Sequence, residues 1–312
     1  MKKNRMTEKQ NPGEENLTGT WYAVTAFGLW GILPIFWKLL TEISPYEIVA
    51  HRVVWTCLFC ACLLFLRRRL ARVREIFTSK AKMRGLLLAA FLLGVNWLTF
   101  VYSVNSNQVL DASMGYYINP LVSVFLGLLV LKEKVNRWQK ISILLAFTGV
   151  LIIAFQYGKI PWIALTLAFT FGLYGLIKKT GGVDAITGLT IETLLMIPAA
   201  LGFILLTAVN GKGVIVTGPL TTFLLLMSTG AVTAVPLLFF AGAAQRIPLS
   251  RVGFIQYLTP TCFFLLGRFV FHETFSLVQL VSFIFIWIAL IIYSFSHTAF
   301  MKKSQKKLNR SR

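Results

Sequence analysis

Apolar residues in this chain occur in long runs that short polar stretches separate. The ten runs are Thr20–Leu40, Glu47–Leu66, Arg84–Val104, Ala112–Leu131, Trp138–Phe155, Pro161–Ile177, Thr187–Val209, Pro219–Phe240, Val252–Phe271 and Leu277–Ser296. A helix of about 20 apolar residues crosses a hydrocarbon core of about 30 Å. The runs are apolar on all sides, whereas strands of a membrane barrel alternate apolar and polar residues. The pattern therefore predicts an all-α, polytopic membrane protein with ten transmembrane helices.

Lysine and arginine gather in alternate connections between these runs. The amino tail, the connections after the even-numbered runs and the carboxyl tail carry most of them, while the other connections carry only Lys159 and Lys212. Short cytoplasmic loops retain Lys and Arg. We therefore expect a plasma (inner) membrane protein with both termini in the cytoplasm. The net charge of +20 then suits an anionic inner leaflet, and not nucleic acid, as the partner.

The composition leaves little room for other classes of protein. Of the residues, 56% are hydrophobic and 13% charged, and no connection is long enough for a soluble domain. All four cysteines lie inside apolar runs, so Cys57-x-x-Cys60 is interpreted as packing and not as a metal site. The chain has no phosphate-binding loop and no nucleophile elbow. We expect neither an enzyme nor a bound cofactor.

The two halves of the chain repeat each other. Phe27–Ile32 matches Phe171–Leu176, and Tyr117–Pro120 matches Tyr257–Pro260. The offset of 140 residues between the second pair also aligns Gly127, Glu133 and Gln139 with Gly267, Glu273 and Gln279. Five helices per half is an odd number, so the second half must enter the membrane from the other side. We predict a cytoplasmic amino tail (1–19), a first five-helix repeat (20–155), a second, inverted repeat (156–296) and a basic cytoplasmic tail (297–312).

Four groups of residues resemble a known family: Glu47-x-x-x-His51-Arg52, Asn96-Trp97-Leu98, Ala112–Pro120, and Arg246–Ser250 followed by Gln256-Tyr257. They are similar to the RarD group of the EamA family, in the drug/metabolite transporter superfamily, and the similarity covers nearly all of residues 20–296. The resemblance implies a ten-helix permease whose substrate is poorly defined.

Inverted five-helix repeats are typical of secondary transporters, which bind substrate near the membrane midplane where the repeats meet. We therefore expect a secondary active or facilitative transporter that moves a small polar or amphipathic metabolite, such as an amino acid or a drug-like compound, by alternating access. One alternative is an integral-membrane enzyme acting on lipid, for which Glu47, His51 and Asp111 are the nearest acid–base set. The other is a regulatory subunit that transports nothing.

Ionisable residues at membrane depth are costly and therefore point to function. Arg52 lies in the second run, and the inverted match pairs it with Glu192 in the seventh. These opposite charges are predicted to form an ion pair, either lining the cavity or clamping two helices. Glu192 is the predicted coupling residue, with protons as a partner. His51 is either a pH-sensitive site residue or a packing residue.

Polar and aromatic residues in other runs complete the predicted site, with interhelical packing as their alternative role. The predicted substrate-binding residues are Trp30, His51, Arg52, Asn96, Tyr116, Asn119, Tyr174, Glu192, Gln256 and Thr259. Proline permits helix bending, so Pro120 and Pro260, at matching positions, are predicted hinges. Runs 1–4 and 6–9 are expected to line the cavity, and runs 5 and 10 to support it from outside.

Overall fold

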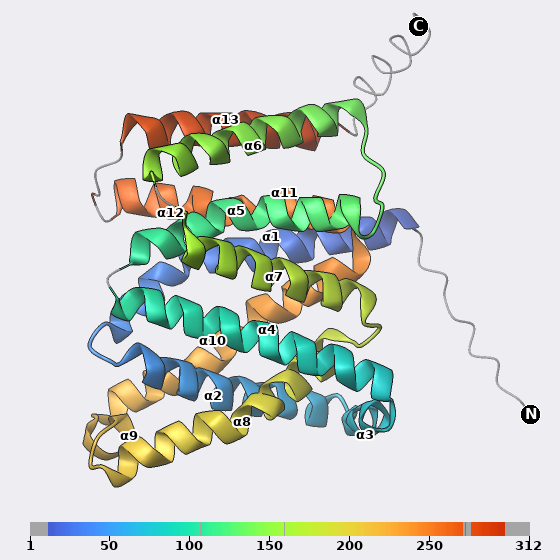
Figure 1. Cartoon of the computed structure of the whole chain (residues 1–312). Coiled ribbons are helices and arrows are strands. Elements are labelled where there is room, and N and C mark those ends of the chain that lie inside the picture. The colour runs from blue at the N-terminus through green and yellow to red at the C-terminus, as the bar shows by residue number, and fades with distance from the viewer. Residues whose placement is uncertain (1–11, 107, 159, 271, 273–275, 297–312) are drawn as a thin grey trace, which may run out of the picture.

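The apolar runs fold into helices that lie side by side in one bundle (Figure 1). The structure is a computed structural model that describes residues 12–106, 108–158, 160–270, 272 and 276–296. Its helices are α1 (Pro12–Trp37), η1 (Lys38–Leu40), α2 (Pro45–Leu66), α3 (Leu70–Thr78), α4 (Lys80–Asn105), α5 (Val109–Leu129), α6 (Arg137–Tyr157), α7 (Trp162–Thr180), α8 (Ala185–Val209), α9 (Val214–Thr217), α10 (Leu220–Arg246), α11 (Leu249–Gln256), α12 (Leu258–Phe269) and α13 (Leu277–Phe295). The described residues contain no strand, as the sequence pattern predicted.

Eight helical segments among the described residues are long and apolar enough to cross a membrane: those of α1 with η1, α2, α4, α5, α6, α8, α10 and α13. The predicted count of ten is not confirmed by this measure. The sixth run forms α7, which carries Lys178 and Lys179 in its last turn, and these two lysines lower its mean hydropathy. The ninth run is divided between α11 and α12, each too short to span a membrane alone.

The break in the ninth run follows from Pro260. A proline inside a helix has no N–H to donate and its ring clashes with the carbonyl four residues earlier, which here belongs to Gln256. Helix α11 ends at that residue, and α12 begins after Tyr257. The matching Pro120 lies inside α5, which continues as a single helix. The two prolines were predicted as paired hinges, but they have different local geometries, and movement at either stays a prediction.

Helix boundaries follow local sequence signals. At the start of α6, Asn136 and Gln139 form a capping box, in which each side chain accepts a hydrogen bond from the other residue's backbone N–H. Ser276 and Gln279 form the same box at the start of α13. Helix α1 begins at Pro12, within the predicted amino tail, with acidic residues in its first turn where the helix dipole favours them. The rest of that tail and the predicted carboxyl tail lie outside the described residues.

Helices that lie far apart in the sequence pack against each other in the bundle. Helix α2 packs on α8 and α6 packs on α13, while α1 packs on α10, α11 and α12, and α7 packs on α4 and α5. The α6–α13 pair lies at one edge (Figure 1), as expected for runs 5 and 10. Close packing uses small residues: a Cβ on Gly230 of α10 would lie 2.4 Å from the backbone carbon of Trp55 in α2.

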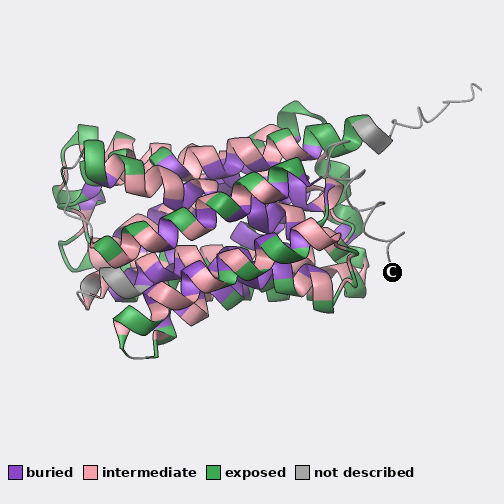
Figure 2. Cartoon of the chain, turned by 90° about the horizontal axis from the view of Figure 1, so that it is seen from above, coloured by how far each residue is buried: buried purple, intermediate pink, exposed green. Residues whose placement is uncertain are grey.

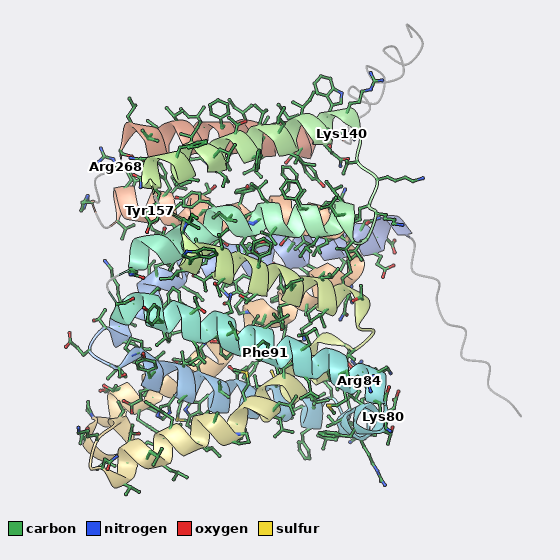
Figure 3. All side chains as sticks on the ribbon, viewed as in Figure 1. Lys80, Arg84, Phe91, Lys140, Tyr157 and Arg268 are labelled. Atoms are coloured by element: carbon green, nitrogen blue, oxygen red, sulfur yellow. The ribbon has the colours of Figure 1, made fainter. Side chains whose placement is uncertain are left out.

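The described chain begins and ends at the same end of the bundle, which we call the tail end, and the other is the far end (Figure 1). Buried residues line the interior between the helices (Figure 2). Lys80, Arg84 and Lys140 lie toward the tail end and Arg268 lies at the far end, while Phe91 lies between them (Figure 3). An apolar girdle between two charged ends is the arrangement that a bilayer requires.

Candidate functional site

The most buried ion pair among the described residues joins Lys178 of α7 to Glu192 of α8. Glu192 is fully buried and Lys178 is 5% exposed. The Lys178 ammonium contacts Glu192 Oε1 directly, and the Tyr174 hydroxyl donates a hydrogen bond of 3.1 Å to Oε2. The ammonium also lies 5.0 Å from the centre of the Tyr174 ring. The structure thus brings together two predicted residues, Tyr174 and Glu192, and adds a lysine that was not predicted.

The predicted ion pair between Arg52 and Glu192 is wrong. Helix α2 begins at the far end and α8 at the tail end (Figure 1). Each residue lies seven positions after its helix begins, or about 10 Å from opposite ends of the bundle at 1.5 Å per residue. Inverted symmetry places matching residues at equal depths from opposite faces, so matched charges meet only if they lie at the midplane.

A small cavity reaches the Lys178–Glu192 pair from the tail end. Its volume is about 40 Å³, and Lys82 and Gly85 of α4 and Gly181 also line it. A buried water needs roughly 10–15 Å³ of such volume and two or more polar partners. The cavity can therefore hold water in contact with the pair.

Arg52 lies between aromatic rings and has no anionic partner among the described residues. Its guanidinium carbon is 4.1 Å from the centre of the Trp97 ring and 5.6 Å from the centre of the Trp37 ring. Its Nε is buried without a hydrogen-bond partner. The Tyr116 hydroxyl is close enough to interact electrostatically with the guanidinium. Cation–π contacts stabilise a desolvated guanidinium by about 2 kcal/mol, but they leave its N–H groups available to an anion.

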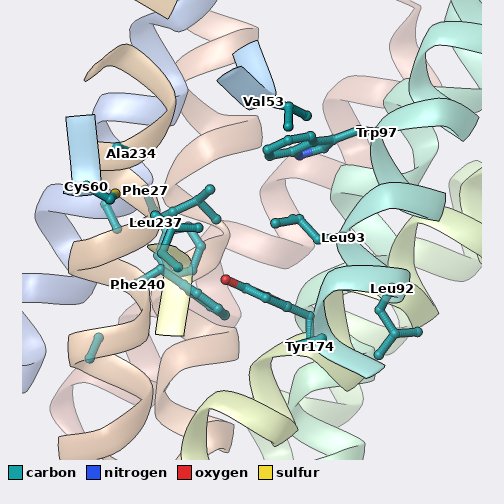
Figure 4. Packing of buried hydrophobic residues seen from close by; sticks show 14 of the residues in the cluster. Phe27, Val53, Cys60, Leu92, Leu93, Trp97, Tyr174, Ala234, Leu237 and Phe240 are labelled. Carbon is teal, nitrogen blue, oxygen red and sulfur yellow. The ribbon is translucent and has the colours of Figure 1, made fainter. Parts of the chain in front are cut away.

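An apolar layer separates the two charged sites. Figure 4 shows Leu93 between Trp97, which contacts Arg52, and Tyr174, whose hydroxyl contacts Glu192. Beside Tyr174, an aromatic cluster is formed by Phe27, Trp30, Phe171 and Phe240. Trp30, a predicted site residue, thus belongs to this aromatic cluster, where its ring packs against Phe27, Phe171 and Phe240.

His51 belongs to a separate group near the far end of α2. It is 2% exposed, and its Nδ1 accepts a hydrogen bond of 3.2 Å from the Trp55 indole. Its Nε2 is 4.0 Å from Glu47 Oε1, and that oxygen accepts the backbone N–H of Val214 at 2.5 Å. Glu47 therefore fixes the connection between α8 and α10, and His51 packs beside it. Although His51 and Arg52 are neighbours in the sequence, the His51 ring contacts Glu47 and Trp55, whereas the Arg52 guanidinium contacts Trp37 and Trp97.

The other predicted polar residues mostly join helices. Asn96 of α4 donates to the Leu167 carbonyl at 3.0 Å and to Thr170 Oγ1 at 2.9 Å. Thr259 donates to a backbone carbonyl of α1 at 2.9 Å. Gln256 accepts from a serine hydroxyl of α5 at 3.4 Å. These contacts fit the packing alternative.

Asn119 differs from these residues, because its Oδ1 is buried without a hydrogen-bond partner. An unpartnered buried acceptor costs about 1–3 kcal/mol. Among the predicted polar residues, Asn119 therefore retains an acceptor that a ligand or a water molecule can use.

Sequence reasoning missed Lys178, Trp37 and Trp97 as site residues. Lys178 lies one position beyond the sixth apolar run, so it was assigned to a cytoplasmic connection. The 3.6-residue period was the available signal, since Lys178 follows Tyr174 by four positions and shares its helix face. No described group of three His, Cys, Asp or Glu residues is arranged to hold a metal ion.

Comparison with known proteins places this fold in a family. The model of the EamA-like transporter family matches residues 17–155 and again residues 159–295. A crystal structure aligns with this chain at a TM-score of 0.68 and 14% identity, covering 88% of this chain and 96% of that chain. That likeness concerns the fold alone.

Similar proteins occur in several bacteria. The chain is 44% identical to "Uncharacterized transporter YojE" of Bacillus subtilis, covering 93% of this chain and 98% of that protein. It is 40% identical to "Protein RarD" of Streptomyces exfoliatus over 94% of this chain and 93% of that protein. It is 38% identical to "Protein RarD" of Escherichia coli over 88% of this chain and 93% of that protein. The chain therefore belongs to the EamA-like transporter family and is a multi-pass membrane transporter similar to the RarD proteins.

Proposed function

We propose that this transporter is a secondary carrier that moves a small metabolite bearing a carboxylate, such as an amino acid or a related amphipathic compound, by alternating access. The observation that carries the proposal is Arg52, a half-buried arginine whose Nε is buried without a hydrogen-bond partner and which no described carboxylate neutralises. A charge inside a bilayer is costly. A ligand of opposite charge that binds during function offsets that cost, which is a physical reason for an arginine at this position. A planar guanidinium binds a carboxylate through two parallel hydrogen bonds.

The surroundings of Arg52 fit an amphipathic anion. Trp37 and Trp97 exclude water from two sides of the guanidinium, and exclusion of water strengthens its attraction for a carboxylate. The same rings provide apolar contact for the rest of the substrate. The Tyr116 hydroxyl near the guanidinium is available as a further hydrogen-bond donor.

Alternating access requires two related halves, and the packing of the helices supports them. In the proposed architecture ten spans form a 5+5 inverted repeat, with α7 and the α11–α12 pair as the sixth and ninth spans. Under this scheme α10 is equivalent to α4, and α1 to α7. The contact of α1 with α10 then repeats that of α7 with α4, and the contact of α10 with α2 repeats that of α4 with α8. The two separate family matches also support two repeats.

We place the tail end on the cytoplasmic side of the plasma membrane. The connections at this end carry basic residues such as Arg67–Arg69 between α2 and α3, and Lys132 and Lys134 between α5 and α6, and cytoplasmic loops are enriched in such residues. Arg52 then lies nearer the outer surface, and the Lys178–Glu192 pair nearer the cytoplasm.

Coupling to protons is assigned to Glu192. The cavity beside Lys178 has room for water, which would give a proton access from the cytoplasm. Protonated Glu192 no longer neutralises Lys178, so the ammonium becomes a second cation for the substrate carboxylate. Loss of the proton restores the Lys178–Glu192 pair and expels the anion. The Leu93 layer keeps the two cationic sites apart between these states.

A stabilisation screen on purified protein tests the site. A carboxylate metabolite at about 100 times its dissociation constant should raise the unfolding free energy of the parent by about 2.7 kcal/mol. Arg52→Ala should abolish this effect, and Arg52→Lys should weaken it, because lysine retains the charge but lacks the planar fork. Arg268→Ala, which removes an exposed arginine, serves as the control. Equal stabilisation of all variants would refute the Arg52 site.

Transport into liposomes tests the coupling separately. Glu192→Gln should bind the metabolite and exchange it across the membrane, but a pH gradient should no longer drive accumulation. Transport by the parent that ignores a pH gradient would refute proton coupling and leave the Arg52 site standing. A protein that binds the metabolite but shows neither flux nor counterflow would refute the carrier function.

A further inference from the structure

An apolar groove at the tail end lies outside both charged sites. It has a volume of about 510 Å³ and runs between α2, α3 and α8. This volume lies in the range of about 300–1,000 Å³ that is typical of ligand sites. Leu64 and Cys57 of α2 line it, and these residues are about 10 Å apart along the helix. The groove therefore extends from the end of the bundle toward its middle.

Helix α3 forms the entrance to the groove. It lies across the ends of the long helices and is seen end-on in Figure 1. Ile76 on one face is buried against α4 and α8, while Leu70 and Phe77 are more than half exposed and line the groove. An amphipathic helix rich in arginine, with apolar side chains exposed at the end of a membrane bundle, lies in the headgroup region of a bilayer.

The charge around this entrance is strongly positive. Arginine occupies positions 67, 68, 69, 72 and 74. Arg72 forms an ion pair with Asp184 at 3.4 Å, and Glu75 pairs with Lys82 at 3.4 Å. Arg74 lines the groove and has no carboxylate partner among the described residues. An arginine at the mouth of an apolar groove matches a molecule with an anionic head and an apolar chain.

We propose that this groove binds an anionic phospholipid of the cytoplasmic leaflet, with its phosphate on Arg74 and an acyl chain along the groove toward Cys57. The phosphate accepts hydrogen bonds from the guanidinium. Leu70 and Phe77 flank the upper part of the chain, and Leu64 and Cys57 contact its lower part. This binding site is additional to the proposed carrier function and does not depend on it.

The bound lipid connects the two helices that carry the charged sites. The Cys57 thiol in the groove lies 4.0 Å from the Thr190 carbonyl of α8, within sulfur hydrogen-bond distance, and Glu192 is two residues further along. A chain in the groove therefore contacts α2 and α8 together. We expect the lipid to stabilise the packing of these helices.

Lipid binding is tested by native mass spectrometry and thermal unfolding of the purified full chain with phosphatidylglycerol or phosphatidylcholine. The parent should prefer phosphatidylglycerol by roughly fivefold, the factor that corresponds to about 1 kcal/mol per basic residue near an anionic surface. Arg74→Glu should remove this preference. Lys134→Glu, which changes another exposed basic residue at the tail end, should keep it. Equal binding of the two lipids by the parent, or an unchanged preference in Arg74→Glu, would overturn the proposal.

The acyl chain is tested with two further variants. Ala61→Phe places a ring in the groove that Ala61 lines and should reduce retention of both lipids severalfold. In a variant whose other three cysteines are replaced by serine, phosphatidylglycerol should slow labelling of Cys57 by N-ethylmaleimide, while phosphatidylcholine should have less effect. Unchanged lipid retention in Ala61→Phe, or Cys57 labelling that ignores both lipids, would show that only the headgroup binds and would overturn the groove as the site.

Discussion

Removing one charge of the Lys178–Glu192 pair should destabilise the protein far more than removing both. We consider Lys178→Met, Glu192→Gln and the double variant. The side chains of Lys178 and Glu192 are 4% and 0% exposed. Lys178→Met leaves a buried carboxylate that keeps the hydrogen bond from the Tyr174 hydroxyl but has no countercharge, and Glu192→Gln leaves a buried ammonium. The double variant leaves no charge at all.

The expected magnitudes follow from burial. Breaking a buried ion pair by removing one partner costs about 3–5 kcal/mol, whereas replacing both partners by neutral residues is often close to neutral. We expect the lower part of this range, about 3 kcal/mol for each single variant, because the unfolded chain in detergent also finds partners for its polar groups. The double variant should lose about 1 kcal/mol or less.

The parent, the two single variants and the double variant form a double-mutant cycle. Reversible unfolding in detergent, followed by tryptophan fluorescence, gives the free energy of unfolding of each of these four proteins. The exposed pair of Lys82 and Glu75, also at the tail end and with side chains 37% and 68% exposed, is the control. Its cycle should give at most about 1 kcal/mol. If the effects of Lys178→Met and Glu192→Gln simply add in the double variant, the two groups do not act as a buried pair and the reasoning is refuted.

Three other substitutions, one of them with a matched control, test helix packing and capping. Gly230→Ala should cost about 1–3 kcal/mol, because its Cβ would meet the backbone of Trp55, while Gly202→Ala, with nothing within 4 Å, should be neutral or stabilising in the same unfolding assay. Glu133→Ala should cost about 1–2 kcal/mol, because Glu133 accepts two backbone N–H groups at the start of α11 at 2.7 and 2.9 Å; a loss below about 0.3 kcal/mol would contradict that role. Asn96→Leu should cost about 1 kcal/mol through two lost hydrogen bonds to α7, and unchanged stability would show that they contribute nothing.

The sequence predicted the helices well because their signals are long and periodic. A run of about 20 apolar residues is unlike any soluble element, and the locations of all ten runs correspond to helices. The match of Gln139 with Gln279 had a local cause that the structure reveals, since both residues complete capping boxes. Helix α3 was not predicted, because its nine residues carry too many arginines to resemble a membrane span.

The site was harder to predict because it depends on which helices are neighbours. The match between the two halves identified Arg52 and Glu192 as a pair of charged residues inside apolar runs. It did not show how deep in the bundle each one lies. Trp97 contacts Arg52 from α4 and Trp37 from the end of α1. A single sequence does not show that these helix ends meet. Lys178 was excluded by the boundary drawn at the last apolar residue, although a long lysine side chain reaches back along its helix.

The proposed repeat also explains why the charge of Glu192 is neutralised by a neighbouring side chain and that of Arg52 is not. The offset of 144 residues that matches Trp30 with Tyr174 also matches Pro34 with Lys178, while an offset of 140 residues matches Arg52 with Glu192. In the second half, the residues of this set are Tyr174, Lys178 and Glu192, and the lysine neutralises the carboxylate. In the first half they are Trp30, Pro34 and Arg52, and the proline offers no charge to the guanidinium. Arg52 therefore lacks a partner at the position where its counterpart has one, which is the condition for an external anion to bind there.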